Sequence, residues 1–465
     1  MISVSLEWIA EQVNGTLFGE STTLCGVSTD TRQITQGDLF IALVGPNFDG
    51  HKFVDVAAQQ GASALLVSTK ADSHLPQILV EDTKLALGQL GAAVKATLAP
   101  KTVGITGSSG KTTVKEMVAS ILGRRGNVLA TQGNFNNDIG VPLTLLRLTP
   151  EHEYAVIEMG ANHLGEIAYT TSLVKPDVAT IVNAAASHLE GFGSLLGVAR
   201  AKSEIFKGLQ ASGTAVLNAD SQFYKFWEGK LRHANVLTFS LEGNADFHAQ
   251  DVTLGLDGCA NFDLLTSQGR VPVSLPLPGM HNVGNALVSA ALAMQVGATL
   301  EDIRDGLQTM QQVGGRLNVK QLTNQIKLLD DSYNANVASV KAAIELLASF
   351  SGLRVLVLGD MAELGEKSRD YHQQVGEFAK QKGIDMLLSV GVLSQFASHE
   401  FEQSGGHFED KQTLVDSLCE RVVGEQRDIT ILVKGSRSSK MDEVVNMLEA
   451  SPLGKFERSR ERIAC

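Results

Sequence analysis

TVGITGSSGKTT, at residues 102–113, is the stretch that decides the fold of this chain. The β-branched run at 103–106 predicts a buried strand, and the spacing of apolar residues over 114–122 predicts a helix. A tight turn and the start of the helix are expected between them, at Gly107, Ser108, Ser109, Gly110, Lys111, Thr112 and Thr113. This order favours phosphate binding, because backbone N–H groups and the positive end of the helix dipole then face one point.

Lys111 and Thr112 have specific roles in such a loop. Lys111 would reach the β- and γ-phosphates of a nucleotide, and the Thr112 hydroxyl would bind Mg²⁺. The general pattern has four residues between its two glycines, whereas Ile105 stands at the first glycine position and Gly107 leaves only two. The alternative is an ordinary strand-to-helix turn, but Gly-Lys-Thr at the predicted helix start favours phosphate binding.

The composition indicates a packed protein without a nucleic-acid partner. Its 465 residues allow about three domains of typical size. Hydrophobic residues make up 43% and charged residues 19%, which favours packing over disorder. The net charge is −12 and aromatic residues are only 5%, whereas nucleic-acid binding needs a basic face or stacking platforms. An anionic small substrate needs only a local basic pocket, so that class stays open.

The cysteines and the N-terminus favour a cytoplasmic location. Cys25, Cys259, Cys419 and Cys465 lie far apart without a C-x-x-C pair, which is typical of free thiols in a reducing compartment. The sequence starts without a basic leader or an apolar core of signal length. No apolar run approaches the about 18 residues of a membrane helix. We therefore expect a cytoplasmic protein, without a membrane partner and monomeric.

Three α/β units are expected along the chain. Residues 1–81 predict a small unit with helices at 6–13 and 53–60 and strands at 38–43 and 64–67. Two polar loops in this unit, STDTR at 28–32 and NFDGH at 47–51, consist of residues that also form ordinary turns.

Residues 82–313 alternate predicted strands and helices, which is typical of parallel β-α-β units. An antiparallel insertion is expected at 235–275, followed by a long helix at 282–296. The parallel strands are expected at 103–106, 128–131, 155–158, 178–182 and 215–217.

Gly314 and Gly315 predict a hinge before the third unit, 314–465. The charged tail at 455–462 is expected to be frayed. Strands of a second α/β sheet are expected at 327–329, 355–358, 386–389 and 429–433.

Three candidate catalytic residues stand near strand ends of the second unit. Glu158 ends a strand, where a carboxylate either holds Mg²⁺ beside the loop or is simply solvated. His188 follows the strand at 178–182, and a ligand role is reasonable because ligands bind at the carboxyl edge of such sheets. Lys202 lies on the next helix, where residue type alone favours a solvated lysine.

Further polar clusters lie at predicted strand ends and helix starts. The loop GNFNN at 133–137 suits a polar substrate. His281, Asn282 and Asn285 begin the long helix, where an Asn amide either caps the helix or reads the edge of an adenine. Two clusters in the third unit, 330–336 and 434–437, could close over a nucleotide and an anionic substrate.

In this order the motifs resemble the Mur ligase family, the ATP-dependent amide-forming ligases of peptidoglycan synthesis. In that family the loop reads TGxxGKT, so the unusual glycine spacing becomes a match. The resemblance covers essentially the full chain and rests on TGSSGKTT (106–113), EMGANHLGEI (158–167), SHLEGFG (187–193), HNVGNAL (281–287), GGR (314–316) and DDSYNAN (330–336). DDSYNAN and LVLGDMAELGEKS (356–368) are similar to members that add D-alanyl-D-alanine to UDP-N-acetylmuramoyl-tripeptide.

The resemblance implies an α/β fold of three domains. Residues 1–81 would be a small UDP-sugar domain, because STDTR, GDLFIAL and FDGH resemble the corresponding family motifs. Residues 82–313 would be a P-loop ATPase domain with a parallel sheet and the antiparallel insertion. Residues 314–465 would be a Rossmann-like domain that binds the nucleotide and the incoming dipeptide.

The resemblance also implies a mechanism and its residues. ATP would phosphorylate the tripeptide carboxylate, and the amine of D-alanyl-D-alanine would attack the acyl phosphate. Thr112 and Glu158 would bind one Mg²⁺, and His188 with a CO₂-derived carbamate on Lys202 would bind a second. These residues and Lys111 would be catalytic. The implied ATP contacts are Gly107, Ser108, Ser109, Gly110, Lys111, Thr112, Thr113, Asn282, Arg316 and Asp331. The implied substrate contacts are Ser28, Thr29, Asp30, Arg32, Asp49, Gly50, His51, Asn134, Asn334, Lys434 and Arg437.

The sequence differs from the motifs of related ligases at two points, and two alternative functions were considered. The DNPR motif of the related third-residue-adding ligase is absent, and Val337 stands where the family commonly has proline, which should alter loop stiffness more than chemistry. A folylpolyglutamate synthase-like ligase shares the loop and the amide chemistry but lacks a UDP-sugar domain. A P-loop switch protein without ligase activity would not need the carboxylate, histidine and lysine.

Overall fold

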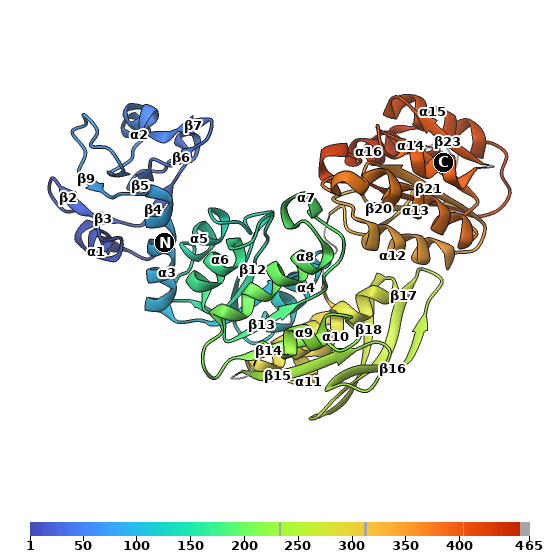
Figure 1. Cartoon of the computed structure of the whole chain (residues 1–465), viewed down its shortest axis with the longest axis horizontal. Coiled ribbons are helices and arrows are strands. Elements are labelled where there is room, and N and C mark those ends of the chain that lie inside the picture. The colour runs from blue at the N-terminus through green and yellow to red at the C-terminus, as the bar shows by residue number, and fades with distance from the viewer. Residues whose placement is uncertain (232–233, 311–313, 403, 456–465) are drawn as a thin grey trace, which may run out of the picture.

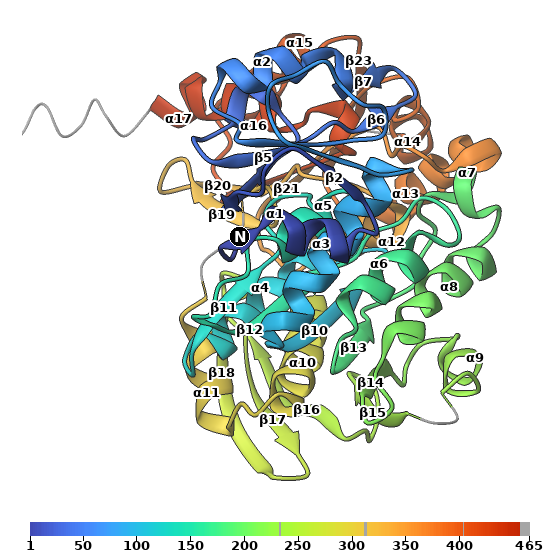
Figure 2. The same cartoon turned by 90° about the vertical axis from the view of Figure 1, so that its left-hand side faces the viewer.

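The computed structural model describes residues 1–231, 234–310, 314–402 and 404–455. Three lobes follow one another from left to right in Figure 1, each built on its own main sheet, which confirms the expected three-domain α/β fold. Figure 2 shows the N-terminal lobe above the central sheet and in front of the C-terminal lobe. Most of the predicted frayed tail and Cys465 lie outside the described residues, and the boundaries after 81 and 313 stay predictions.

The N-terminal lobe is a five-stranded sheet with one antiparallel edge strand, β2. Its order is β2 (Thr16–Phe18), β9 (Gln77–Leu79), β8 (Ala64–Val67), β5 (Asp38–Ile41) and β4 (Gly26–Ser28). All four residues of β5 are buried, because helices cover both faces of the sheet. The remaining elements are β1 (Val4–Ser5), β3 (Thr23–Leu24), β6 (Val44–Gly45), β7 (Phe48–Asp49), α1 (Leu6–Gln12) and α2 (Val54–Gln59).

Helix α3 (Thr83–Leu98) joins this lobe to the central one. Its first turn is capped by Asp82, whose carboxylate accepts hydrogen bonds from the N–H groups of Lys84 and Leu85. Leu87 and Leu90 are fully buried in one apolar core that includes residues of α1 and of the central sheet. The N-terminal lobe is therefore packed onto the central lobe through a shared core.

The central lobe has a nine-stranded sheet. Its order is β11 (Asn127–Ala130), β12 (His152–Glu158), β10 (Lys101–Thr106), β13 (Val178–Ile181), β14 (Thr214–Asn218), β15 (Asn235–Ser240), β16 (Phe247–Leu254), β17 (Cys259–Thr266) and β18 (Gly269–Pro278). The expected antiparallel insertion at 235–275 is corrected at its start, because β15 pairs in parallel with β14 and β16. Only β16 to β18 pair antiparallel, and they extend the same sheet.

Both faces of the central sheet are covered, so alternate residues of a strand enter different cores. In β12, Val156 belongs to one core, whereas Ala155 and Ile157 belong to the other. Helix α10 is buried nearly all round, as expected of a core helix. The helices of the lobe are α4 (Lys111–Leu122), α5 (Gly140–Leu145), α6 (Glu166–Val174), α7 (Leu189–Phe192), α8 (Leu195–Ser203), α9 (Tyr224–Glu228), α10 (Met280–Gln295) and α11 (Leu300–Gln308).

The C-terminal lobe has a six-stranded sheet that is parallel except for its edge strand β19. Its order is β19 (Asn318–Gln321), β20 (Ile326–Asp331), β24 (Ile429–Lys434), β21 (Leu353–Gly359), β22 (Met386–Val390) and β23 (Gly405–Phe408). Its helices are α12 (Val337–Ala348), α13 (Ser368–Gln381), α14 (Gln395–Phe401), α15 (Lys411–Val422), α16 (Asp442–Ala450) and α17 (Pro452–Lys455). Val337 is the first residue of α12, a position where proline is also well accommodated.

Two further observations bear on the expectations from sequence. Within the described ranges, none of the helices has the length and apolar character that crossing a membrane requires. Cys25, Cys259 and Cys419 are free thiols, as the spacing predicts.

Candidate functional site

The predicted phosphate loop connects β10 to α4 as expected. Gly110 lies at φ +77°, in the left-handed region that glycine adopts without cost, and it is the residue before the first turn of α4. A Cβ atom at this position would lie 2.9 Å from Oδ1 of Asn285. Glycine is therefore required here both by the backbone and by the close approach of α10.

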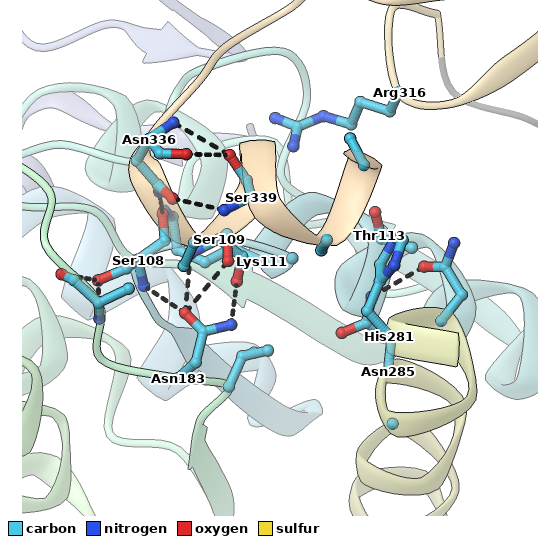
Figure 3. A pocket seen from close by; sticks show the side chains of 18 of the residues that line it. Ser108, Ser109, Lys111, Thr113, Asn183, His281, Asn285, Arg316, Asn336 and Ser339 are labelled. Atoms are coloured by element: carbon cyan, nitrogen blue, oxygen red, sulfur yellow. Dashed lines mark hydrogen bonds between the residues drawn. The ribbon is translucent and has the colours of Figure 1, made fainter. Parts of the chain in front are cut away.

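Asn183 holds this loop from the neighbouring strand, and sequence reasoning missed it. Its Oδ1 accepts hydrogen bonds from the backbone N–H groups of Ser108 (3.2 Å) and Ser109 (2.9 Å), as Figure 3 shows. Its Nδ2 donates to the backbone oxygen of Ser109 at 3.1 Å. The available signal was its position directly after the strand predicted at 178–182, which pairs with the loop-bearing strand β10.

Lys111 lies within the loop that precedes it. Its Nζ donates a 2.8 Å hydrogen bond to the backbone oxygen of Gly107. Desolvation lowers the pKa of Lys111, the nearby Glu158 opposes this effect, and Arg316 of the C-terminal lobe adds to it. The ammonium is thus placed where it could neutralise a phosphate that enters the loop.

Thr112 and Glu158 are in direct contact. The Thr112 hydroxyl donates a 2.9 Å hydrogen bond to Oε2 of the buried Glu158, and Nδ2 of Asn136 donates to Oε1 at 2.8 Å. Sequence reasoning predicted the exposed Asn134 of the 133–137 loop as a substrate contact, which stays a prediction, and did not name Asn136, which makes this contact with Glu158. A hydroxyl beside a carboxylate fits Mg²⁺, which takes hard oxygen ligands and completes its shell with waters and phosphate oxygens.

His188 and Lys202 both contact the Phe192 ring. The His188 ring meets it edge-on at 6.4 Å between centroids, and Nζ of Lys202 lies 5.6 Å from its centre. The Nδ1 atom of His188 forms an ion pair with the carboxylate of Glu363, from the C-terminal lobe. Neither His188 nor Lys202 has a hydrogen bond to Thr112 or Glu158. In the described part of the chain, no three His, Cys, Asp or Glu side chains are grouped closely enough to hold a metal ion, so the four residues stay predicted ligands.

The electrostatic surroundings of this second pair favour uncharged forms. Lys202 is 1% exposed, and desolvation together with the nearby Lys111 lowers its pKa to about 7. Desolvation also lowers the pKa of His188, an effect that Glu363 opposes and that Lys111 and Lys202 reinforce. A neutral amine and a neutral imidazole are the forms that react with CO₂ and bind a metal, respectively.

A cavity of about 460 Å³ lies between the central and C-terminal lobes, beside the loop. Asn282 and Asn285 line it from α10, where Nδ2 of Asn282 donates to the backbone oxygen of Pro278 and Nδ2 of Asn285 to Oδ1 of Asn282. Burial lowers the pKa of His281 in the same wall. The cavity walls contain these of the predicted residues: Ser108, Ser109, Gly110, Lys111, Thr112, Thr113, Asn282, Arg316, Asp331, Asn334 and Lys434.

The C-terminal wall of the cavity carries charged side chains, each of which contacts a partner in the same lobe. The Arg316 guanidinium lies 4.4 Å from the centre of the Tyr333 ring. Lys434 forms an ion pair with Asp331 and donates to the backbone oxygen of Asn334 at 3.0 Å. Arg437 lies outside the walls, 5.7 Å from the Tyr333 ring and paired with Asp442.

The predicted N-terminal substrate residues lie at the carboxyl ends of β4 and β7, whereas the cavity is lined by residues of the central and C-terminal lobes. Asp30 pairs with Arg32, and their hydrogen bonds lower the pKa of Asp30 to about 2. Nδ1 of His51 contacts Asp49 at 2.8 Å, and its Nε2 accepts a hydrogen bond from the N–H of Ser68 at 3.0 Å. Ser28, Thr29 and Gly50 lie in the same two loops.

Three protein families match successive parts of the chain. They are described as the Mur ligase family, catalytic domain (residues 23–99), the Mur ligase middle domain (105–293), and the Mur ligase, glutamate ligase domain (315–437). The chain is 53% identical to UDP-N-acetylmuramoyl-tripeptide--D-alanyl-D-alanine ligase of Escherichia coli, over 97% of this chain and 99% of that one.

Solved structures of MurF ligases also resemble this chain over nearly its whole length. The crystal structure of MurF from Acinetobacter baumannii matches with a TM-score of 0.93 and 37% identity, over 97% of this chain and 100% of that chain. The MurF ligase of Thermotoga maritima in complex with ADP matches with a TM-score of 0.83 and 29% identity, over 92% and 98% of the two chains. Relatives this similar along nearly the whole length of both chains establish that this protein belongs to the Mur ligase family.

Proposed function

We propose that the protein joins D-alanyl-D-alanine to UDP-N-acetylmuramoyl-tripeptide with ATP, as an enzyme of peptidoglycan synthesis. The observation that carries this proposal is the cavity between two lobes, which has the phosphate loop and Lys111 on one side and Arg316, Asp331 and Lys434 on the other. The named activity of a relative with 53% identity over 97% of the chain supports the substrates. The two alternative functions, a folylpolyglutamate synthase-like ligase and a P-loop switch protein, are disfavoured because this relative is named as a ligase of UDP-N-acetylmuramoyl-tripeptide.

The reaction divides into two steps. The γ-phosphoryl group of ATP passes to the terminal carboxylate of the tripeptide, which gives an acyl phosphate and ADP. The amine of D-alanyl-D-alanine then attacks the acyl carbon; the new C–N bond forms, the C–O bond to phosphate breaks, and the amine releases a proton. Phosphoryl transfer depends mainly on positioning and charge neutralisation. Lys111 lies in the loop for that task, whereas the N–H groups of Ser108 and Ser109 donate to Oδ1 of Asn183, which holds the shape of the loop.

The nucleotide would lie across both walls of the cavity. Asn282 and Asn285 would offer amides to the adenine edge, Asp331 would offer a carboxylate to the ribose hydroxyls, and the Arg316 guanidinium would contact the phosphates. Thr112 and Glu158 would hold Mg²⁺, which supplies neutralisation of the phosphate charge. Asn136 donates to the other oxygen of Glu158 and so fixes the direction in which the carboxylate faces.

We extend the proposal to a carbamate on Lys202. An ammonium group cannot bind a metal, because it only donates hydrogen bonds. The pKa of about 7 leaves a substantial fraction of the amine neutral at physiological pH, and a neutral amine adds CO₂. The resulting anion beside Phe192 and His188 would be a second hard-oxygen ligand near the loop.

The N-terminal loops are proposed to bind the uridine diphosphate of the sugar substrate. Asp30, Arg32 and His51 hold their loops through local pairs, and the Arg32 side chain stays exposed, where an anionic ligand could reach it. A substrate bound there would extend its peptide toward the cavity. The free thiols support a cytoplasmic location, where ATP and nucleotide sugars are available.

The test is phosphate release by the purified full chain with ATP and UDP-N-acetylmuramoyl-tripeptide, with and without D-alanyl-D-alanine. We expect ADP and phosphate in a ratio of about one, formed at a sustained rate only with all three substrates. Formation of AMP and pyrophosphate would contradict the mechanism, because the γ-phosphoryl group must reach the carboxylate.

A further inference from the structure

A single loop of the C-terminal lobe contacts the predicted metal-binding histidine of the central lobe. The carboxylate of Glu363 pairs with Nδ1 of His188. The backbone oxygen of Glu363 also accepts a 2.9 Å hydrogen bond from the N–H of Leu189, the next residue. Two independent contacts, one from the side chain and one from the backbone, therefore join this loop to α7.

Both partners of this contact have an unusual backbone. Glu363 lies at φ +62° and His188 at φ +51°, in the left-handed region that is uncommon for residues other than glycine, although histidine adopts it more often than glutamate does. Such conformations cost free energy and persist where surrounding contacts hold them, often at functional sites. The cross-lobe contact is thus made by two strained residues that face each other.

The contact determines how the imidazole is presented. The Glu363 carboxylate lies within ion-pair distance of Nδ1 but without the geometry of a hydrogen bond. Its negative charge favours the tautomer with the proton on Nδ1, which leaves the lone pair on Nε2 free for a ligand. The edge of the same ring rests on Phe192, whose ring also contacts Lys202. Glu363 and Phe192 together fix the rotation of the ring.

We propose that Glu363 is a positioning residue that orients His188 for metal binding, so that the second metal site is complete only when the C-terminal lobe is docked. The inference rests on the proposed function, because it takes His188 as a ligand. Carboxylates that contact metal-binding histidines are a known means of raising metal affinity. Since Glu363 belongs to the other lobe, metal binding and lobe docking must strengthen each other.

The variants isolate the side chain from the backbone contact. Glu363→Ala removes the carboxylate but keeps the backbone oxygen that binds Leu189. Glu363→Gln keeps an acceptor for the Nδ1 proton without the charge. Glu366→Gln is the matched control, because Glu366 is an exposed glutamate of the same loop with no ion pair among the described residues.

The measurement is Mn²⁺ binding by electron paramagnetic resonance, in the presence of a non-hydrolysable ATP analogue, with His188→Ala as reference for loss of the second site. We expect Glu363→Ala to weaken the His188-dependent Mn²⁺ site about tenfold. Glu363→Gln should weaken it less, and Glu366→Gln should leave it unchanged.

Two outcomes would overturn the inference. One is wild-type Mn²⁺ affinity in Glu363→Ala, whether or not small-angle scattering shows a changed lobe arrangement, because the contact would then only join the lobes. The other is wild-type Mn²⁺ affinity in His188→Ala. Failure of the proposed function is seen separately, as absence of phosphate release by the wild-type chain with its three substrates.

Discussion

The Nζ atom of Lys111 donates a 2.8 Å hydrogen bond to the backbone oxygen of Gly107, four residues earlier. The bond holds the positive charge within the turn of the loop. Lys111→Ala should lower kcat about 10²–10³-fold, since a charge aimed at the transferring phosphoryl group is lost. Thermal melting should change little, and Lys207→Ala, an exposed lysine of the same lobe, serves as control. A kcat near that of wild type would remove the loop from the reaction.

Asn183→Ala should weaken ATP binding. Its Oδ1 binds two backbone N–H groups of the loop, and each such hydrogen bond contributes about 1 kcal/mol. Losing both, about 2 kcal/mol, predicts a KM for ATP raised roughly 30-fold, measured by phosphate release at saturating tripeptide. Asn183→Asp should be worse, because its charge would face the phosphates. Asn235→Ala, at an exposed position of β15, should have no effect; an unchanged KM in Asn183→Ala would refute the support role.

Lys202→Ala should lose activity, with partial recovery when formate or acetate is added. The truncated side chain leaves room for a small carboxylate to take the place of the carbamate oxygen atoms. Phosphate release with and without the added anion measures the effect. Full activity in the unsupplemented variant would exclude a carbamate from the mechanism.

The fraction of Lys202 that carries the carbamate should depend on pH. Desolvation lowers the pKa of Lys202 from 10.5 to about 7, so the amine is mainly neutral above about pH 7 and mainly protonated below it. Only the neutral amine adds CO₂, so carbamate occupancy should fall as the pH drops from about 8 to 6. Nuclear magnetic resonance with carbon-13-labelled bicarbonate detects the adduct directly. Equal occupancy across this range would contradict the titration.

Asp30→Asn and His51→Ala should raise the KM for the UDP-linked substrate and leave that for ATP nearly unchanged. Both side chains hold loops of the N-terminal lobe, whereas the cavity beside the phosphate loop is lined by residues of the other two lobes. Asp72→Asn, an exposed position of the same lobe, is the control. The reverse pattern, with only the KM for ATP raised, would place the uridine site elsewhere.

Local pattern predicted the strands and helices that carry the site. The strand at 64–67 was predicted with the observed limits, and Lys111 begins α4 as expected. These elements are specified by runs of β-branched residues and by helical spacing, which a single sequence displays.

Contacts between distant segments could not be predicted in the same way. Asn183 lies about 75 positions from the serines it binds, and Glu363 reaches His188 from another lobe. Strand β15 was assigned to an antiparallel insertion because a short apolar run does not reveal the direction of its partner. The direction of a strand and its pairing partner depend on how the chain crosses the sheet, and the local spacing of apolar residues does not reveal that path.

Helix α10 forms one wall of the cavity from residues that also belong to the interior of the lobe. It buries 13 of its 16 residues, and the asparagines at its start stand on the same rigid core as the sheet. A substitution that reshapes this wall must also repack the interior, at a typical cost of 1–3 kcal/mol for an overfilled core. An inhibitor that contacts this wall would therefore meet a surface where resistance mutations weaken the fold that the bacterium needs.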